Sequence, residues 1–380
     1  MRHLKSNWRK LAYVSALALS LASLTSPAQA LDWSALETGF NSDVWALTYW
    51  NGQPVAGGSF TFTGGGDPVT RIARWNGSVW QPLGAGCNNI VQALTSYQGD
   101  LVAAGSFTTP ATRIARWNGT TWSPFAGGFD NTVYAVTVYN NQLIAAGAFT
   151  NAGTTPVNRI ARWNGTAWEA LGDGFNSIVY SLGVYNGQLI AGGAFTLSGA
   201  NQRLRIARWD GTNWLTLSTG MNSDVYALQA YGTNLIAGGA FTTAGGNACN
   251  GIAQWNGTAW SALGQSLNNV VEALTVYNGT LIAGGRFTSV NANPGVNLNY
   301  VARWNGATWS PLVGAMDNWV HCLATNQVLF AGGSYTAAGS TLANRVARWS
   351  DTTCAADTNG DHVVNVDDLL SVISGWGACP

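Results

Sequence analysis

The chain has 380 residues, of which only 9% are charged, and its 17 basic and 17 acidic side chains give no net charge. Nucleic-acid-binding surfaces need clustered Lys and Arg, so this charge balance argues against a nucleic-acid partner. The chain is rich in Gly, Asn, Thr and Trp, with recurring Val and Ile, which is typical of all-β proteins.

Residues 1–30 have the pattern of a secretory signal peptide. An apolar run over 11–24 precedes Ala28-Gln29-Ala30, whose small residues are typical of a cleavage site. Four basic residues stand before the run: Arg2, Lys5, Arg9 and Lys10. Cleavage after Ala30 leaves 13 basic and 17 acidic residues, a net charge of −4. We expect a secreted or cell-surface protein without a membrane span, and a retained N-terminal anchor is the alternative.

Residues 31–350 contain one motif seven times. Fourteen of the 19 Trp residues fall into two slots of this motif. The first slot ends a phrase like R-I-A-R-W, and holds Trp75, Trp117, Trp163, Trp209, Trp255, Trp304 and Trp349. The second begins W-x-x-L, and holds Trp33, Trp80, Trp122, Trp168, Trp214, Trp260 and Trp309. Within each slot, successive Trp residues are 42 to 49 residues apart. A repeat of this length indicates a solenoid, an array or a propeller.

Each unit contains four short apolar runs separated by turn signals. In one unit the runs cover 225–228, 235–242, 251–255 and 260–264, and Asn256-Gly257 joins the last two. Asn-Gly favours the tight type I′ turn of a β-hairpin. We therefore predict four antiparallel strands per unit, called a, b, c and d in chain order.

The two ends of the repeated region complement each other. It begins with a lone d strand, 32–36, and ends with a, b and c strands that finish at Trp349. In a ring, the first d strand can complete the last blade, which has only a, b and c strands. A linear array would leave both ends incomplete. The sequence predicts a seven-bladed β-propeller of four-stranded blades over 31–350, closed by a blade shared between the termini. A linker, 351–353, follows.

The repeat also resembles known propeller families. A Gly-Gly pair ending strand b, as in Gly57-Gly58, followed by an aromatic residue and then Trp, resembles kelch repeats. The phrase V-A-R-W-N-G at 301–306, with A-G-G-x-F-T at 237–242, is similar to repeats of many secreted bacterial proteins and of fungal cortical polarity-marker proteins. The resemblance implies the propeller fold and carries over no catalytic residue.

Length varies in only one segment of the repeat, the b–c loop. The stretch from Phe107 to Ile114 is the shortest and that from Phe287 to Val301 the longest. The b–c loops and d–a connections must share one face of the ring, and rigid scaffolds commonly present binding residues on such loops. We expect a protein or glycan partner at this face of a monomer. The alternative is that these are ordinary solvated loops.

One position of strand a changes around the ring. In chain order it holds Trp45, Gln92, Tyr134, Tyr180, Tyr226, Glu272 and His321. The four residues other than Tyr are contiguous through the closure, and Trp319 lies beside His321. We predict ligand binding by Glu272, His321, Trp45, Gln92 and Trp319. The alternatives are an acid–base pair and packing variation between blades.

Catalytic patterns are lacking in the sequence. After residue 30 there are two His and three Glu, and no nucleophile elbow, metal triad or glycosidase-like carboxylate pair stands out. The favoured function is therefore a secreted, non-catalytic binding or interaction propeller, with no catalytic residues assigned. A propeller enzyme acting on extracellular polysaccharide and a structural cell-envelope protein are the alternatives.

Five cysteines occur in the chain. Cys354 and Cys379 bracket the C-terminal segment, and we expect them to form a disulfide. Cys87 and Cys322 occupy positions that sibling repeats fill with small or apolar residues, so we expect them to be buried. Cys249 lies in a b–c loop, and the sequence assigns it no role.

The C-terminal segment, 354–380, contains a calcium-loop pattern. Its oxygen ligands have the spacing of an EF-hand loop: Asp357, Asn359, Asp361, the carbonyl of Val363, Asn365 and Asp368. His362 stands where such a loop needs Gly. Asp at the last ligand position and the phrase from Cys354 to Cys379 resemble the single-loop dockerin-like tails of planctomycete-type secreted proteins. The resemblance implies a calcium cofactor, and either a cohesin-like partner or sorting to a cell-surface anchor.

Overall fold

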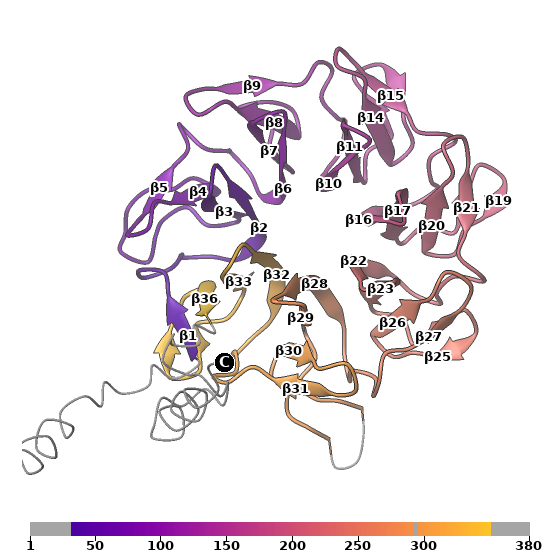
Figure 1. Ribbon diagram of the computed structural model, residues 1–380. Helices are drawn as coiled ribbons and strands as arrows, with labels where there is room; N and C mark the ends of the chain where they lie inside the picture. Colours follow the sequence, from indigo (N-terminus) through magenta and orange to yellow (C-terminus); the bar gives the residue numbers. More distant parts are fainter. Residues whose placement is uncertain (1–31, 292–294, 351–380) are drawn as a thin grey trace, which may run out of the picture. The chain divides into compact units, whose positions relative to one another are not determined.

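The computed structural model describes residues 32–291 and 295–350, and residues 32–350 form one compact unit. Seven four-stranded antiparallel sheets surround a common centre (Figure 1). Blade 1 contains β2 (Val44–Trp50), β3 (Gln53–Gly58), β4 (Ile72–Trp75) and β5 (Trp80–Pro82). Blade 2 contains β6 (Val91–Tyr97), β7 (Asp100–Gly105), β8 (Ile114–Trp117) and β9 (Trp122–Pro124). Blade 3 contains β10 (Val133–Tyr139), β11 (Gln142–Gly147), β14 (Ile160–Trp163) and β15 (Trp168–Ala170).

The remaining blades follow the same order. Blade 4 contains β16 (Val179–Tyr185), β17 (Gln188–Gly193), β20 (Ile206–Trp209) and β21 (Trp214–Thr216). Blade 5 contains β22 (Val225–Tyr231), β23 (Asn234–Gly239), β26 (Ile252–Trp255) and β27 (Trp260–Ala262). Blade 6 contains β28 (Val271–Tyr277), β29 (Thr280–Gly285), β30 (Val301–Trp304) and β31 (Trp309–Pro311). Blade 7 contains β32 (Val320–Thr325), β33 (Leu329–Gly333), β36 (Val346–Ser350) and, from the start of the chain, β1 (Asp32–Ala35).

The a strands lie innermost, and β1 closes the ring (Figure 1). It pairs antiparallel with β36, which places Trp33 opposite Trp349. The predicted seven-bladed, all-β fold with four-stranded blades is confirmed, and so is its closure by a blade shared between distant parts of the chain.

Glycine allows close contact between blades. A Cβ added to Gly57 would lie 2.5 Å from Cγ1 of Val91 in the next blade. The first turn of blade 1 needs positive φ at both central residues, Asn51 (49°) and Gly52 (74°). These values fit the predicted tight hairpin, because Asn and Gly tolerate the left-handed region better than other residues.

The two Trp slots hold each blade together and tie it to the next. Within blade 1 the rings of Trp75 and Trp80 lie 5.4 Å apart. Between blades, the indole N–H of Trp122 donates to the carbonyl of Leu83, and that of Trp260 to Leu217, at 2.8 and 3.0 Å. The same bond joins Trp214 to Leu171 and Trp309 to Leu263, so it ties four pairs of neighbouring blades together.

The b–c loops are more regular than the sequence suggested. Four of them contain a small β-hairpin, formed by β12 (Asn151–Ala152) with β13 (Thr155–Pro156), β18 (Leu197–Ser198) with β19 (Asn201–Gln202), β24 (Thr243–Ala244) with β25 (Asn247–Ala248), and β34 (Ala337–Ala338) with β35 (Thr341–Leu342). Five loops end on an Arg with positive φ, for example Arg71 at 68°. Its guanidinium donates to the carbonyl of Ser59, which follows strand b. These contacts hold the loops over the ends of the inner strands.

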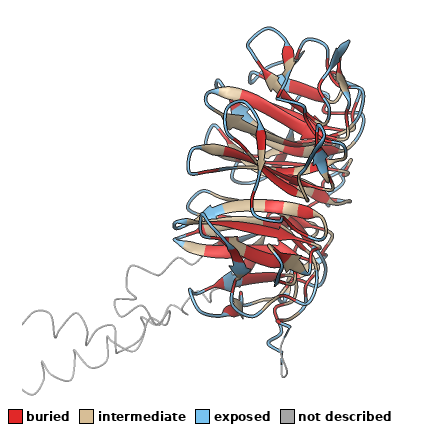
Figure 2. Ribbon diagram, turned by 90° about the vertical axis from the view of Figure 1, so that its right-hand side faces the viewer, coloured by how far each residue is buried: buried red, intermediate tan, exposed pale blue. Residues whose placement is uncertain are grey.

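Buried residues line the contacts between blades, and exposed residues lie on the turns and loops (Figure 2). Cys87 is buried as predicted, whereas Cys322 is only half-buried and its thiol donates to the carbonyl of Val44. Cys249 packs in the core beside Phe241 and Trp260, and burial raises the pKa of its thiol. It stands three residues before strand c, where other blades place small buried residues such as Val69. Its role is therefore packing.

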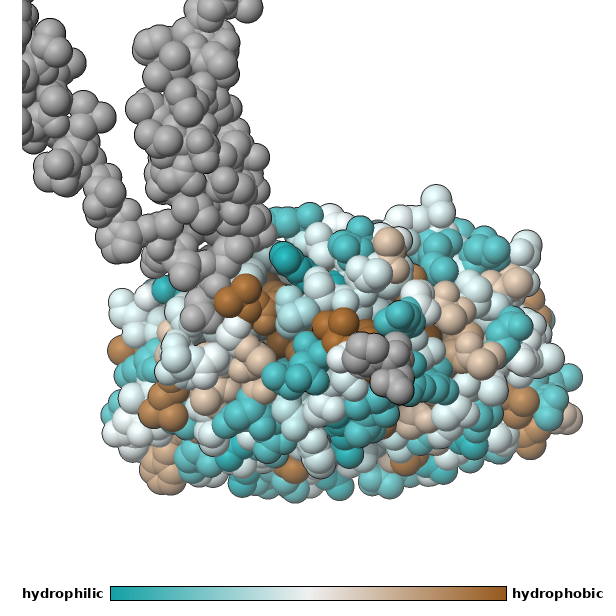
Figure 3. Space-filling view, turned by 90° about the horizontal axis from the view of Figure 1, so that it is seen from below, coloured by the Kyte–Doolittle hydropathy of each residue, from teal (hydrophilic) through white to brown (hydrophobic). Residues whose placement is uncertain are grey.

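The edge of the ring is mainly hydrophilic, with small separate hydrophobic areas, in the view of Figure 3. Within residues 32–291 and 295–350 no helix has the length and apolar character that crossing a bilayer requires. The predicted signal peptide, the Cys354–Cys379 disulfide and the calcium loop lie outside the described residues.

Candidate ligand-binding site at the bulge ring

The variable position of strand a is a β-bulge in every blade. The pairing with strand b shifts register once in each a strand, and the residue at the shift is the variable one. We call these residues the bulge ring: Trp45, Gln92, Tyr134, Tyr180, Tyr226, Glu272 and His321. A bulge redirects a side chain and leaves its residue outside the ladder. Side chains at this position can therefore vary without loss of strand pairing.

Blades 3 to 5 form a regular half of the bulge ring. The ring centroids of Tyr134 and Tyr180 are 5.5 Å apart, and those of Tyr180 and Tyr226 are 5.0 Å apart. The hydroxyl of Tyr226 donates to Asp224, which pairs with Arg205 at 3.2 Å. Burial, the negative charge of Asp224 and the neighbouring Tyr180 raise the pKa of Tyr226 to about 12.

Blades 6 and 7 replace the tyrosines by a polar chain. Nδ1 of His321 lies 2.5 Å from Oε2 of Glu272, and Nε2 lies 2.7 Å from the hydroxyl of Ser334. The other carboxylate oxygen of Glu272 accepts a hydrogen bond from Nε of Arg286. The side chain of His321 is 2% exposed and that of Glu272 is 11% exposed. Both nitrogens of a buried imidazole are thus satisfied.

The carboxylate of Glu272 is held in its ionised form. Burial raises the pKa of Glu272, but the hydrogen bonds from His321 and Arg286 and their charges outweigh it, so the pKa lies below its usual value. An ionised carboxylate only accepts hydrogen bonds, so Nδ1 of His321 carries a proton and Nε2 can accept one from Ser334. Glu272 and Arg286 form an ion pair whose charges compensate each other.

Two indoles flank this polar chain. Trp45 of blade 1 stacks on His321 at a centroid distance of 4.0 Å and an interplanar angle of 19°. Trp319 meets the imidazole at 76°, and the guanidinium of Arg286 lies 4.3 Å from its ring centroid. Trp319 is 39% exposed, which is unusual for a large aromatic residue and leaves much of its ring available to a ligand.

The structure brings together four of the five predicted binding residues: Glu272, His321, Trp45 and Trp319. Gln92 occupies the next bulge, but its side chain makes no hydrogen bond to them or to any other described residue. The cluster is built from β28, β32 and β2, far apart in sequence but side by side at the centre (Figure 1). In the described ranges no group of His, Cys, Asp or Glu is arranged to hold a metal ion.

Sequence reasoning missed Arg286 and Ser334. Both occupy the first position after strand b, where the other blades carry only Ser or Ala. Arg286 is the one charged residue in that column, a signal that alignment of the seven repeats could have revealed. Ser334 could not be found in this way, because Ser59 and Ser106 stand at the same position.

Comparison with known proteins identifies the fold alone. No protein-family model matches the chain, and no curated protein matches it. Among solved structures, it is similar to the WD40 β-propeller domain of Doa1 (TM-score 0.55, 13% identity, covering 85% of this chain and 97% of that one). It is also similar to the computationally designed Ika8 protein (TM-score 0.52, 16% identity, 84% and 100%). The extracellular domain of BT4673 from B. thetaiotaomicron gives a TM-score of 0.58 at 11% identity over 84% of this chain, which spans 40% of that chain.

Proposed function

We propose that this protein is a secreted, non-catalytic binding propeller whose ligand contacts the bulge ring at blades 6, 7 and 1. The observation that supports this proposal is that residues which differ from those of the other blades are concentrated at blades 6, 7 and 1. Glu272, His321, Trp45, Trp319 and Arg286 each occur only once among the seven blades at their positions, and they touch one another. Packing alone needs no such polar cluster, since blades 3 to 5 are packed with three tyrosines.

The chemistry favours an uncharged ligand with an apolar face. The charges of Glu272 and Arg286 compensate each other, so this ion pair offers no net charge to an ionic partner. Trp319 offers an exposed indole, and aromatic residues dominate the energetics of many binding sites. A glycan or a protein segment rich in apolar side chains meets these requirements. The signal-peptide pattern of residues 1–30 supports secretion.

Binding measurements on the full chain test this proposal. We expect Trp319→Ala to weaken binding to glycan arrays or to proteins of the cell surface by about tenfold or more, since hot-spot aromatics contribute about 2 kcal/mol. Val79→Ala is the control, because Val79 is another exposed apolar residue, at 41% exposure, and lies in a c–d hairpin on the opposite face of the ring. Equal affinities of the two variants would contradict a site at Trp319.

A second candidate function is hydrolysis of ester groups on an extracellular polysaccharide. Ser334, His321 and Glu272 are hydrogen-bonded in the order nucleophile, base and carboxylate that acyl transfer uses. In this reaction the Ser334 oxygen would attack the ester carbonyl, His321 would pass its proton to the leaving alcohol, and water would release the acid. Trp45 covers the imidazole, so a substrate could reach it only by displacing that ring. This cover makes binding the better-supported function.

Turnover assays separate the two candidates. Acetylated xylan is a suitable substrate, because release of acetate reports ester hydrolysis directly. Hydrolysis by the full chain that disappears in Ser334→Ala would establish the second candidate. If the full chain hydrolyses no ester and its ligand binding requires Trp319, the result supports the non-catalytic binding function.

We further propose that the C-terminal segment binds one calcium ion and anchors or sorts the protein, through a cohesin-like partner or the cell surface. Asp357, Asp361 and Asp368 would supply three carboxylates, and Asn359, Asn365 and the Val363 carbonyl three neutral oxygens. Such sites in extracellular modules bind calcium with a Kd of ~10⁻⁴ M. Calorimetry on the full chain should detect one calcium site that Asp357→Ala abolishes and that His362→Gly strengthens.

A further inference from the structure

Blade 5 departs from the repeat on the opposite face, where the hairpins lie. The residue before the Trp of strand c is Arg in six blades, and Gln254 in blade 5. Elsewhere this Arg reaches a side chain on a neighbouring strand, as Arg208 does with Gln188 at 3.2 Å. The shorter Gln254 instead accepts a hydrogen bond from Asn234 at 3.0 Å and donates to the carbonyl of Ala262 at 3.3 Å. A charged, long side chain is thus replaced by an amide.

The contact between blades 5 and 6 is also open on this face. At the end of strand a, Trp50, Tyr139 and Tyr185 each donate to a carbonyl in the first hairpin of the next blade, at 2.9, 3.3 and 2.8 Å. Tyr231 holds the same position in blade 5, yet its hydroxyl, like that of Tyr97 in blade 2, makes no hydrogen bond within the described part of the chain. A polar group at this position therefore remains available.

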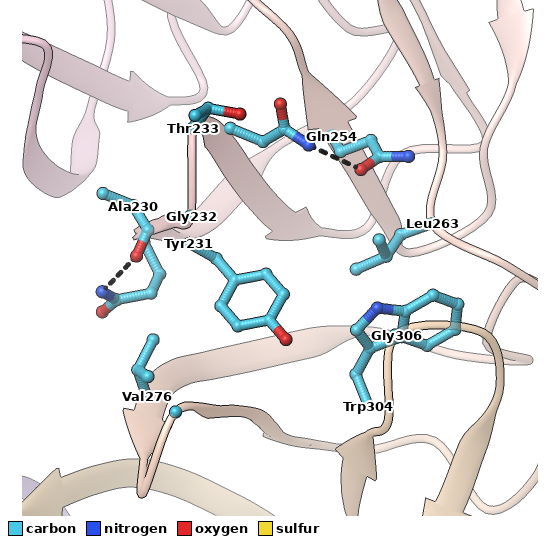
Figure 4. A pocket seen from close by; sticks show the side chains of 12 residues that line it. Ala230, Tyr231, Gly232, Thr233, Gln254, Leu263, Val276, Trp304 and Gly306 are labelled. Carbon is cyan, nitrogen blue, oxygen red and sulfur yellow. Dashed lines mark hydrogen bonds between the residues drawn. The ribbon is translucent and has the colours of Figure 1, made fainter.

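An open groove of about 760 Å³ occupies this gap. The ring of Tyr231 points into the space bounded by Gln254, Leu263, Trp304 and Val276 (Figure 4). Its size lies within the range of ligand pockets, about 300–1,000 Å³. The amide that replaces Arg in blade 5 alone and the unpaired hydroxyl of Tyr231 thus open onto one groove.

The lining specifies the class of ligand. None of the described residues that line the groove is charged. Tyr231, Asn234 and Gln254 offer hydroxyl and amide groups with unused donors or acceptors. Leu263, Val276 and Trp304 provide an apolar wall. A ligand that fits carries many hydroxyl groups, no charge and an apolar ring face, and a neutral saccharide has all three properties.

We propose that the cleft between blades 5 and 6 is a binding site for neutral oligosaccharides, separate from the bulge ring. It lies on the hairpin face, whereas the bulges stand at the other ends of the a strands. The two sites can therefore be inactivated independently.

The test uses the full chain and isothermal titration calorimetry with cellotetraose, xylotetraose, maltotetraose, chitotetraose and the acidic tetragalacturonic acid. We expect at least one neutral probe to bind and the acidic one not to bind. Gln254→Arg restores the residue of the other six blades, so it should fold normally and weaken binding by more than about tenfold by filling the cleft. Tyr231→Phe should weaken binding by about fivefold, because it removes one hydrogen bond.

The matched control is Arg208→Gln, which places the same amide in blade 4 and should leave the affinity unchanged. Gln254 lies in the cleft and outside the bulge ring, so a loss of saccharide binding in Gln254→Arg reports on the cleft and not on the cluster at Trp319. Binding by none of the neutral probes, equal binding of the acidic probe, or undiminished affinity in Gln254→Arg would each overturn the proposal.

Discussion

The two halves of the bulge ring solve the same packing problem with different side chains. In blades 3 to 5, Tyr134, Tyr180 and Tyr226 contact one another edge to face or tilted. In blades 6, 7 and 1, the same position carries Glu272, His321 and Trp45, which form an ionic hydrogen bond and a stacked pair. Both halves have the same strands and the same bulge. The backbone therefore does not require the polar cluster, and its cost must be offset by contacts between side chains.

This difference shows where a repeated fold can carry individual chemistry. Ladder positions are constrained in every blade, since each residue there must pair and pack against the next sheet. The bulge residue is free of the ladder, so substitution there changes the site and not the strand pairing. The predictions below test this separation between the common scaffold and the variable ring.

The largest effect is expected from the scaffold. Deleting residues 31–38 removes β1, including Trp33, which is 2% exposed and lies against Trp349 at 5.6 Å. Loss of a buried Trp costs about 3–5 kcal/mol, and an unpaired edge adds to it, so we expect the melting temperature to fall by about 10 °C or more. Calorimetry should show a much smaller change on deleting residues 351–380. Equal melting temperatures of the two deletions would contradict closure through β1.

A smaller effect is expected within the polar half. Glu272→Ala leaves the buried N–H of His321 and the guanidinium of Arg286 without their acceptor, which should lower the free energy of unfolding by about 2–3 kcal/mol. Tyr180→Phe is the control in the regular half, where we expect a change within about 0.5 kcal/mol. Urea unfolding measures both. Similar losses in the two variants would show that the halves do not differ energetically.

The scaffold could be predicted from the sequence because its signals are repeated. The Trp slots, the Asn-Gly turns and the lone first d strand each constrain the chain locally, and their agreement specified seven four-stranded blades and the closure. The role of the Leu in W-x-x-L was not apparent, because its carbonyl accepts a hydrogen bond from another blade. The hairpins of the b–c loops were missed as well, since two-residue strands carry no period.

The candidate site was predicted only in part, for a different reason. Comparing the repeats placed Glu272 beside His321, because neighbouring blades bring the same column together. It could not show that Ser334 and Arg286 complete the chain of hydrogen bonds, since they come from strand b and meet the bulge only in three dimensions. The cleft at Tyr231 could not be predicted from the sequence, because a Tyr at this position does not reveal whether its hydroxyl bonds to the next blade.

Acid should remove the contribution of Glu272. Its pKa is lower in the folded protein than in the unfolded chain, so the stabilisation is complete above the unfolded value, about 4.3, and is lost as the pH falls through the folded value. The difference in unfolding free energy between wild type and Glu272→Gln should therefore be constant near neutral pH and shrink in acid.

A carboxylate in blade 3 provides the control for this pH series. Burial raises the pKa of Asp130, but hydrogen bonds from Thr150 and Asn151 outweigh it and lower the pKa to about 2. The contribution removed by Asp130→Asn should therefore be complete above the unfolded value, about 3.9, and be lost as the pH falls from there to about 2. If the difference in unfolding free energy between wild type and Glu272→Gln instead grew as the pH fell, the pKa of Glu272 would be raised and not lowered by folding.

The smallest effect is expected in the regular half, at high pH. Tyr226 has a pKa of about 12, raised by burial and then by the charge of Asp224. Because this value exceeds that of an unfolded tyrosine, about 10, its neutral form stabilises the fold below pH 10, and this contribution is lost as the pH rises through 12. Asp224→Asn removes the charge and should shift ionisation of Tyr226 to lower pH. Ultraviolet titration of tyrosinate can follow this step, which is assigned by its loss in Tyr226→Phe, while Asp130→Asn should leave it in place. An unshifted step in Asp224→Asn would mean that burial alone sets the pKa, and that the regular half is governed by packing without electrostatic coupling.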